Sequence, residues 1–454
     1  MRTKLEECIL YRNFAEEDVL HDIASLLWRL NDEAFTSFVP LGAQGNLHHS
    51  DEDSYWEDRS AYFRGIAALV EMAGSYGFEG NLWHDYLTLL LVNHENAFSK
   101  ACEIRGRVPG SITALAEHDF SIFKELFDLS FSVLDTAFDT NCGKAICSFQ
   151  NADVSGRMFN RRIRDRIGEL SSSLAHAQNT AAFTEAMIGF YHDFGVGKLG
   201  LHKAFRVAHD EKGHVEIVPI KQIAHVQLED LVGYEEAKKK LIENTEAFVC
   251  GRKANNCLLF GEAGTGKSSS IKGILNRYYE RGLRIIEMYK HQFQDLHEVI
   301  AQIKDRNYRF IIYLDDLSFE EFEIEYKYLK AVIEGGLEKK PDNILIYATS
   351  NRRNLIRERF SDKLELADDD DLHSSDTVQE KHSLAYRFGV RIYFGSPMRK
   401  EFENIVRVLA QRNGIEMEEK ELLSEANKWE LSHGGYTGRC AQQFIDHLSG
   451  TLTK

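Results

Sequence analysis

The sequence predicts an α/β fold in which a three-layer domain is built around a largely parallel sheet, with a mainly helical domain before it and a helical lid after it. Three observations lead to this prediction. Apolar residues recur at helical spacing from about Glu16 to His192. Short apolar runs alternate with helical segments from Leu228 onward. The final segment, Lys400–Lys454, has a helical pattern again.

The length of the chain indicates more than one domain. Its 454 residues exceed the roughly 100–200 that a single domain usually holds, so two or three domains are expected. We assign residues 1–194 to the helical N-terminal domain, 195–227 to a β-rich junction, 228–398 to the α/β core and 399–454 to the lid.

The N-terminal domain has the residue spacing of amphipathic helices. One apolar face is formed by Val19, Leu20, Ile23, Leu26, Leu27 and Leu30. Further helices are expected at Ala61–Tyr76, Leu82–Cys102, Ala114–Phe138 and Gly156–Asp193, separated by turn-forming segments. The longest apolar stretch, Tyr86–Val92, is too short for the roughly 20 residues that span a bilayer, so we expect a buried helix there.

A hairpin and five further strands are expected after the N-terminal domain. The runs LHKAFRVAH and HVEIVPI flank a turn signal at Asp210–Gly213, which predicts a β-hairpin. The later strands are expected at Asn256–Phe260, Arg284–Met288, Phe310–Leu314, Ile344–Thr349 and Val390–Phe394. Five strands with helices between them indicate a three-layer α/β core.

Charge and cysteine content limit the class of protein. The formal net charge of −16 disfavours a dominant, non-specific nucleic-acid binder, although it leaves room for a local basic patch. The seven cysteines are scattered without a C-x-x-C pair, so neither a zinc site nor a disulfide framework is expected. The first residues lack the apolar run of a secretion signal. We therefore expect a cytoplasmic protein that spans no membrane.

A glycine-rich segment carries the strongest functional signal. The sequence GEAGTGKS, Gly261–Ser268, fits the pattern G-x-x-x-x-G-K-[ST], follows an apolar strand and precedes a helical pattern. In such a loop the backbone N–H groups point at phosphate oxygens, Lys267 reaches the β- and γ-phosphates, and the Ser268 hydroxyl binds Mg²⁺. The alternative is a glycine-rich turn with a chance match. The residues expected to bind ATP here are Gly261, Glu262, Ala263, Gly264, Thr265, Gly266, Lys267, Ser268 and Ser269.

Two carboxylates end a later apolar strand. Asp315 and Asp316 follow FIIYL, and adjacent carboxylates at the end of a buried strand are costly unless a cation or water satisfies them. Asp315 is therefore the expected second ligand of Mg²⁺, and Asp316 the expected base that activates water. Many relatives of this loop carry Glu at the second position, and the shorter Asp would slow hydrolysis. Glu320 and Glu321 are alternative bases.

A third strand ends in a polar side chain. Asn351 would lie beside the γ-phosphate if its strand neighbours the strand of Asp315, and it would then orient the attacking water. A cap or turn at the strand end is an equally good interpretation of this asparagine.

Together these residues resemble the P-loop NTPases of the AAA+ superfamily. The resemblance implies that Leu231–Ala237 packs on adenine, with contacts from Val232, Gly233 and Tyr234. It implies that Arg387, in the segment YRFG, is an arginine finger for a neighbouring subunit, with Arg391 as the alternative. It also implies that Arg439 contacts phosphate within its own subunit. A surface or ion-pair role is the alternative for either arginine.

A closer resemblance is to the bacterial AAA+ family catalogued as domain of unknown function 815. It covers roughly Gly195 to the C-terminus and includes GKLGLHKAFR, LEDLVGYEEAKKKL, YLDDLSFEEFE and EKHSLAYRFG. In that family the Asp316 variant is normal. The resemblance implies an ATPase but names no client.

We expect an ATPase that binds and hydrolyses Mg-ATP at subunit interfaces of a ring or open arc, and so remodels a protein or nucleic-acid client. The segment Tyr289–Phe293 lacks the aromatic–hydrophobic–glycine signature of AAA+ unfoldases, which disfavours peptide threading. The first alternative is a slow-hydrolysing switch or loader that acts with DNA. The second is a structural scaffold that retains the loop as a relic.

Overall fold

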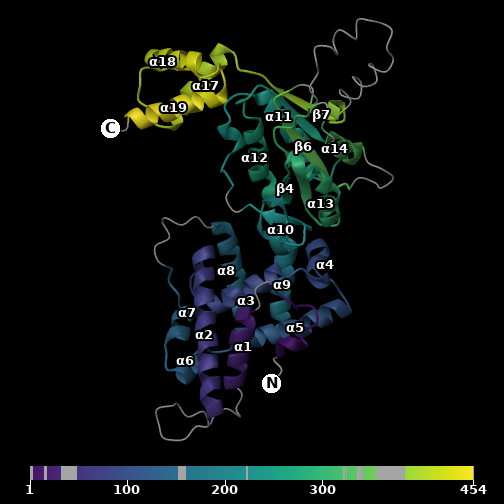
Figure 1. Ribbon diagram of the computed structural model, residues 1–454, viewed down its shortest axis with the longest axis vertical. Coiled ribbons are helices and arrows are strands. Elements are labelled where there is room, and N and C mark those ends of the chain that lie inside the picture. The colour runs from purple at the N-terminus through teal and green to yellow at the C-terminus, as the bar shows by residue number, and fades with distance from the viewer. Residues whose placement is uncertain are drawn as a thin grey trace. The chain divides into compact units, whose positions relative to one another are not determined.

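A computed structural model of the chain describes residues 4–14, 18–31, 49–151, 160–220, 223–320, 323, 325–334, 341–352, 355 and 384–452 (Figure 1). The chain divides into two compact units, Met1–Leu201 and His202–Lys454. The predicted fold class, an α/β core with a helical lid after a mainly helical N-terminal region, is confirmed.

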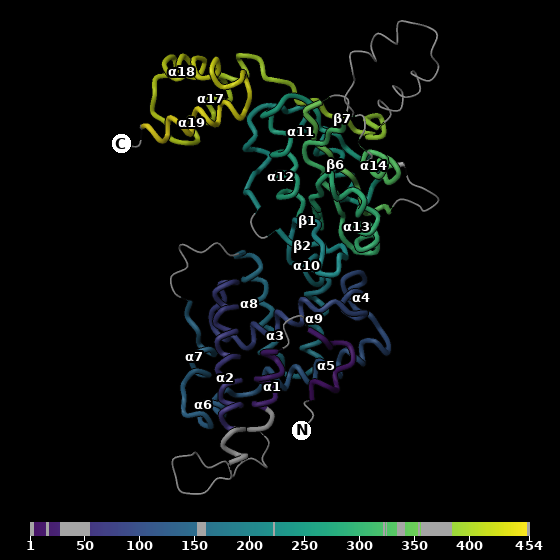
Figure 2. The backbone as a smooth tube through the Cα atoms, viewed as in Figure 1, coloured from purple at the N-terminus to yellow at the C-terminus, as the bar shows by residue number. Residues whose placement is uncertain are grey.

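The first unit is mainly helical in the part that the structure describes, with one isolated antiparallel bridge between Gly80 and Phe149. Its elements are η1 (Lys4–Glu7), α1 (Asp18–Asn31), α2 (His49–Tyr76), α3 (Leu82–Asn93), α4 (Ala97–Arg105), α5 (Ser111–Asp128), α6 (Ser132–Phe138), α7 (Cys142–Cys147), α8 (Arg161–Ala175), α9 (Thr180–Phe194) and α10 (Gly197–Leu201). Helix α3 packs against α2, α5, α7 and α8 (Figure 2). Ten of its twelve residues are buried, so the apolar stretch Tyr86–Val92 is the buried helix that was predicted.

Two of the long helices predicted for this unit are divided by asparagine caps. The predicted helix Leu82–Cys102 is α3 and α4, because the Asn96 side chain accepts from the Ser99 N–H while the Ser99 hydroxyl accepts from the Asn96 N–H. Such a capping box starts a new helix despite continuous apolar spacing. The prediction Gly156–Asp193, which begins outside the described residues, is α8 and α9, with Asn179 as the cap of α9. The prediction Ala114–Phe138 is likewise divided, into α5 and α6.

The second unit is built on a seven-stranded sheet. Its strands are β1 (Ala204–His209), β2 (Val215–Pro219), β3 (Cys257–Gly261), β4 (Leu283–Glu287), β5 (Arg309–Leu314), β6 (Ile344–Ser350) and β7 (Val390–Phe394). Their order is β2-β1-β4-β5-β6-β3-β7. The β1–β2 pair is antiparallel and the other neighbouring pairs are parallel. The five predicted core strands all form, with ends shifted by at most one residue.

The predicted hairpin forms as β1 and β2, and it extends the sheet. Strand β1 pairs in parallel with β4, with Phe205 opposite Ile286. The first compact unit ends at Leu201, so the hairpin lies in the same unit as the core.

Helices cover both faces of the sheet. The helical elements of the core are η3 (Leu228–Asp230), α11 (Glu235–Val249), α12 (Lys267–Tyr278), η4 (Tyr279–Arg281), η5 (Lys290–Asp295), α13 (Leu296–Ile303) and α14 (Glu325–Glu334). Figure 1 shows α11 and α12 on one face and α13 and α14 on the other. The side chains of α11 and α12 share an apolar core with the strands.

The lid contains α17 (Arg399–Arg412), α18 (Glu419–Ser432) and α19 (Gly438–Leu452). It has a small apolar core of its own, in which Phe402, Ile405, Leu422 and Phe444 are buried. No helix within the described ranges is both long enough and apolar enough to cross a bilayer. All seven cysteines are free thiols.

Candidate functional site

The strand order gathers three polar segments at one edge of the sheet. Strand β3 lies between β6 and β7, and β6 lies between β3 and β5. In the parallel register Phe260 is opposite Ser350, and Leu314 is opposite Ala348. The chain segments that follow β3, β5 and β6 therefore begin at the same edge, where ligands of open α/β sheets bind.

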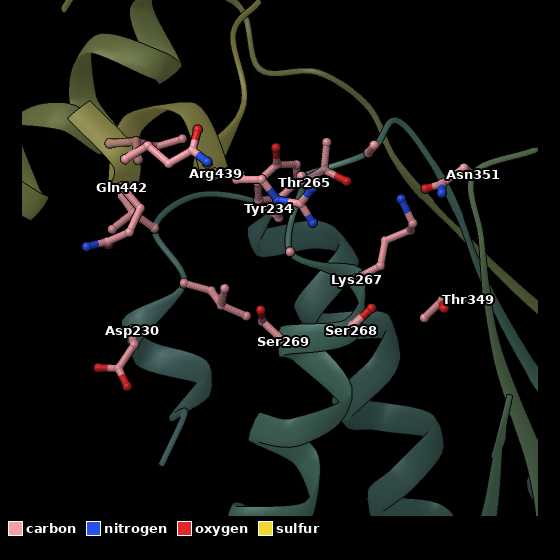
Figure 3. A pocket seen from close by; sticks show the side chains of 18 of the residues that line it. Asp230, Tyr234, Thr265, Lys267, Ser268, Ser269, Thr349, Asn351, Arg439 and Gln442 are labelled. Carbon is pink, nitrogen blue, oxygen red and sulfur yellow. The ribbon is translucent and has the colours of Figure 1, made fainter. Parts of the chain in front are cut away.

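A cavity of about 600 Å³ lies at this edge. Core and lid both line it: Asp230, Leu231, Val232, Tyr234, Ala263, Gly264, Thr265, Gly266, Lys267, Ser268, Ser269, Asp315, Asp316, Thr349 and Asn351 from the core, and Ile405, Leu409, Gly438, Arg439, Gln442 and Gln443 from the lid. Figure 3 shows Lys267 and Ser268 on the side of Thr349 and Asn351, and Arg439 and Gln442 on the opposite side. Gly233, Gly261 and Glu262 belong to the lining segments but do not line the cavity themselves.

The loop between β3 and α12 depends on glycine. Gly261 has a φ of 137°, and a Cβ there would lie 2.0 Å from the Phe394 carbonyl oxygen. Gly264 has a φ of 76°, and its Cβ would lie 3.0 Å from the Arg439 Cβ. Helix α12 then begins without a side-chain cap. The N–H groups of its first turn are consequently available to an anion that enters the cavity.

The buried ammonium group of Lys267 contacts the backbone of this loop. Its Nζ donates to the carbonyl oxygens of Gly261 at 2.9 Å and Glu262 at 2.6 Å. Burial lowers the pKa of Lys267, and the nearby carboxylates of Asp316 and Asp315 oppose this shift. A poorly solvated cation of this kind is stabilised by the approach of an anion such as phosphate.

Three hydroxyl groups converge on one oxygen of Asp315. Its Oδ1 accepts from Ser268 Oγ at 2.9 Å, from Tyr313 Oη at 2.6 Å and from Thr349 Oγ1. Partial burial raises the pKa of Asp315, but the hydrogen bonds from Thr349, Tyr313 and Ser268 outweigh it, so the pKa lies below its ordinary value. The carboxylate is therefore ionised at neutral pH.

The side-chain oxygen atoms of Ser268 and Asp315 suit a magnesium ion that is bound together with phosphate. Both are hard oxygen donors next to the loop, and Mg²⁺ is usually held by one or two carboxylates plus substrate phosphates. In the described ranges no cluster of three or more His, Cys, Asp or Glu side chains forms a metal site. A pair of oxygen donors of this kind suits a metal that arrives with its nucleotide.

Asp316 and Asn351 are in direct contact. Asp316 has a left-handed backbone with a φ of 50°, and its N–H donates to Thr349 Oγ1 at 2.9 Å. Its Oδ1 accepts from Asn351 Nδ2 at 2.8 Å. A left-handed conformation is uncommon for residues other than glycine, although aspartate adopts it more readily than most, and it is often found at functional sites. Of the alternative bases, Glu320 does not line the cavity and Glu321 lies outside the described residues.

Apolar side chains also line the cavity. Val232 and Tyr234 line it from the segment before α11, and Ile405 and Leu409 line it from α17. The Tyr234 ring lies 5.5 Å from that of Phe394, and burial raises the pKa of Tyr234 to about 12. An apolar surface of this kind suits a flat base.

Hydrogen bonds attach the lid to the core around this cavity. The Arg439 N–H donates to the Gly264 carbonyl oxygen at 3.1 Å. The Arg412 guanidinium donates to the carbonyl oxygens of Asp230 at 2.8 Å and Glu229 at 2.9 Å. The Arg439 backbone is therefore held against the loop between β3 and α12.

Two arginines singled out in the sequence do not line the cavity of their own chain. Arg387 precedes β7, whose first residue, Val390, is opposite Cys257 at the start of β3. Arg387 therefore lies near the amino ends of the parallel strands, whereas the loop follows their carboxyl ends. The Arg391 guanidinium lies 4.9 Å from the centre of the Tyr386 ring.

The sequence analysis missed several residues of the site. Thr349 and Tyr313 contact Asp315, and Ile405 and Leu409 line the cavity. The four-residue spacing of Ile405 and Leu409 on a predicted lid helix indicates a shared face. Neither Thr349 nor Tyr313 carries a signal that separates it from other residues of a buried strand.

A comparison with protein families gives one match. The family described as "Protein of unknown function (DUF815)" matches residues 200–452. A comparison with curated proteins gives no match. Similar solved structures include the RuvB Holliday junction branch migration motor of Thermotoga maritima, with a TM-score of 0.36 and 18% identity over 50% of this chain and 65% of that chain. Another is the FIGL-1 AAA domain in complex with ADP, with a TM-score of 0.35 and 16% identity over 51% of this chain and 76% of that chain.

Proposed function

The chain belongs to the DUF815 family, and we propose that it is an AAA+ ATPase that binds and hydrolyses Mg-ATP. One observation carries the proposal. One cavity is lined by a glycine-rich loop, by the Ser268–Asp315 and Asp316–Asn351 pairs, and by several apolar side chains. This arrangement suits a triphosphate joined to a base.

Each group of residues has a role in this proposal. The backbone N–H groups of residues 263–269 and the Lys267 ammonium hold the phosphates. Ser268 and Asp315 bind Mg²⁺, which neutralises charge on the phosphate oxygens when it is bound. Asp316 accepts the proton of the attacking water, and Asn351 orients both Asp316 and that water. Val232 and Tyr234 contact adenine, and Gly233, which does not line the cavity itself, joins them.

The arginines divide between two subunits. Arg439 contacts phosphate from the lid of its own chain. Arg387 does not line its own cavity, so we assign it to the γ-phosphate of a neighbouring subunit in a ring or open arc. Hydrolysis then changes the contacts between subunits and drives the remodelling of a protein or nucleic-acid client. The free cysteines suit a cytoplasmic location.

A turnover assay with Mg-ATP and two variants tests the proposal. Lys267→Ala removes the buried cation and should abolish nucleotide binding. Asp316→Asn keeps the size and shape of the side chain but removes the base, so it should bind ATP without turning it over. Normal turnover by both variants would contradict the assigned roles.

The second candidate function is a slow-hydrolysing switch or loader that acts with DNA. It is favoured by Asp316, whose side chain is one methylene shorter than glutamate and is held by Asn351 at 2.8 Å. Single-turnover hydrolysis with and without DNA separates the two functions. A fast rate that DNA does not change counts against the loader, whereas a slow rate that DNA raises supports it.

A further inference from the structure

Tyr313 brings a hydroxyl group from the core of the sheet to the metal-binding edge. It lies on β5, two residues before Asp315, and only 5% of its surface is exposed. Side chains two apart on a strand lie on the same face, and Tyr313 Oη donates to Asp315 Oδ1 at 2.6 Å. The ring itself belongs to the apolar core that the strands share with α11 and α12.

Tyr313 differs from the other two donors to the same oxygen. Ser268 lies in the first turn of α12 and is itself an expected ligand of Mg²⁺. Thr349 also accepts the backbone N–H of Asp316 at 2.9 Å, so it contacts both aspartates. Tyr313 belongs to neither the loop nor the Asp316 turn, and its buried ring leaves the hydroxyl little freedom. Its hydrogen bond therefore restricts the orientation of Asp315 from the side of the sheet core.

We propose that Tyr313 is a positioning residue that orients the Asp315 carboxylate for Mg²⁺ and thereby sets how strongly Mg²⁺ tightens nucleotide binding. The inference rests on the proposed ATPase function. Partners that hydrogen-bond to a metal ligand orient it, and their loss typically weakens metal affinity about 10- to 100-fold.

The neighbouring strand offers a matched control. Tyr347 on β6 is opposite Tyr313 in the sheet register and belongs to the same apolar core. Its hydroxyl bonds to Asn244 Nδ2 and Thr245 Oγ1, both at 2.9 Å, and it does not line the cavity. Tyr347→Phe therefore removes a buried phenol hydroxyl from the same core without touching Asp315.

Calorimetric titration of ATP into the full chain, once with excess Mg²⁺ and once with EDTA, tests the proposal. For Tyr313→Phe we expect ATP affinity with Mg²⁺ to fall about tenfold or more, while the affinity in EDTA is unchanged. Tyr347→Phe should change neither affinity. The EDTA titration also reports whether the loop of each variant is folded.

The other outcomes overturn the inference in distinguishable ways. If the unmodified protein binds no ATP under either condition, the ATPase proposal fails and this inference fails with it. If Mg²⁺ raises the ATP affinity of the unmodified protein and raises that of Tyr313→Phe by as much or more, only the positioning role fails. An equal loss of affinity with Mg²⁺ and with EDTA would assign Tyr313 to the folding of the site.

Discussion

Ser268 Oγ donates a hydrogen bond of 2.9 Å to Asp315 Oδ1, which joins the first turn of α12 to the end of β5. The two residues are separated by 47 positions in the chain, and the parallel sheet brings them together because β3 and β5 both flank β6. A hydroxyl and a carboxylate at this distance, beside a glycine-rich loop, suit a phosphate-bound Mg²⁺. The proposed function depends on this pair and on the loop around it.

Asn351→Ala should lower turnover without weakening nucleotide binding. The substitution removes the hydrogen bond that holds Asp316 Oδ1 at 2.8 Å, so the base and the water lose their alignment. We expect the turnover rate to fall about 100-fold, as misplaced catalytic groups often cause. Asn343→Ala, just before the opposite end of β6, is the control and should leave the rate unchanged. Equal rates for Asn351→Ala and the unmodified protein would remove Asn351 from the proposed mechanism.

A mixing experiment tests the assignment of Arg387 to a neighbouring subunit. Arg387→Ala should bind ATP but turn it over slowly, and Lys267→Ala should not bind ATP. In mixed assemblies some interfaces combine the intact loop of an Arg387→Ala subunit with the intact Arg387 of a Lys267→Ala subunit. Turnover should therefore exceed the sum of the rates of the two separate variants. If the turnover rates of the mixtures equal the sum of the separate rates at every mixing ratio, Arg387 acts within its own chain or has no role in catalysis.

Arg412→Ala should loosen the lid. The guanidinium bonds to the carbonyl oxygens of Asp230 and Glu229 beside the cavity. Because these bonds are exposed to solvent, we expect nucleotide affinity to fall only about 3- to 10-fold. Hydrogen exchange in α19 should become faster in the same variant. Arg407→Ala, which removes an ion pair with Glu419 inside the lid, should change neither quantity.

Asp85→Asn should stabilise the first unit at neutral pH. Asp85 is buried in α3, and burial raises its pKa to about 6, although a hydrogen bond from Ser171 opposes the shift. The pKa in the folded chain is thus above its ordinary value of 3.8. Ionisation therefore costs folding free energy, and the cost grows as pH rises from about 4 to 6 and is complete above about 6.

Thermal unfolding at two pH values measures this effect. We expect Asp85→Asn to gain about 1–3 kcal/mol over the unmodified protein at pH 8, and much less at pH 4. Glu117→Gln, at an exposed position of α5, should have no such pH-dependent gain. A gain that is equal at both pH values would show that the charge of Asp85 is not the cause.

The sequence predicts the parts of this protein that depend on local pattern. The loop Gly261–Ser268 and the polar ends of β5 and β6 are recognisable because each motif is contiguous with an apolar strand. Helix boundaries are less predictable, since Asn96 and Asn179 cap new helices within stretches that keep helical spacing. Periodicity does not reveal such caps.

The contacts that complete the site depend on tertiary structure. The sequence does not show that Tyr313 rather than Tyr347 bonds to Asp315, because both tyrosines lie in apolar strands. The sheet order and the side-chain direction decide this. Arg412 is likewise an ordinary residue at a helix end until the fold brings it to Asp230, 182 positions away in the chain.

Titration of Mg-ATP into the unmodified chain and into Lys267→Ala tests whether the loop binds nucleotide. We expect saturable binding with one site per chain, and no detectable binding by a Lys267→Ala protein that unfolds at the same temperature. Absence of saturable binding by the unmodified chain, or equal affinity in the two proteins, would contradict this expectation.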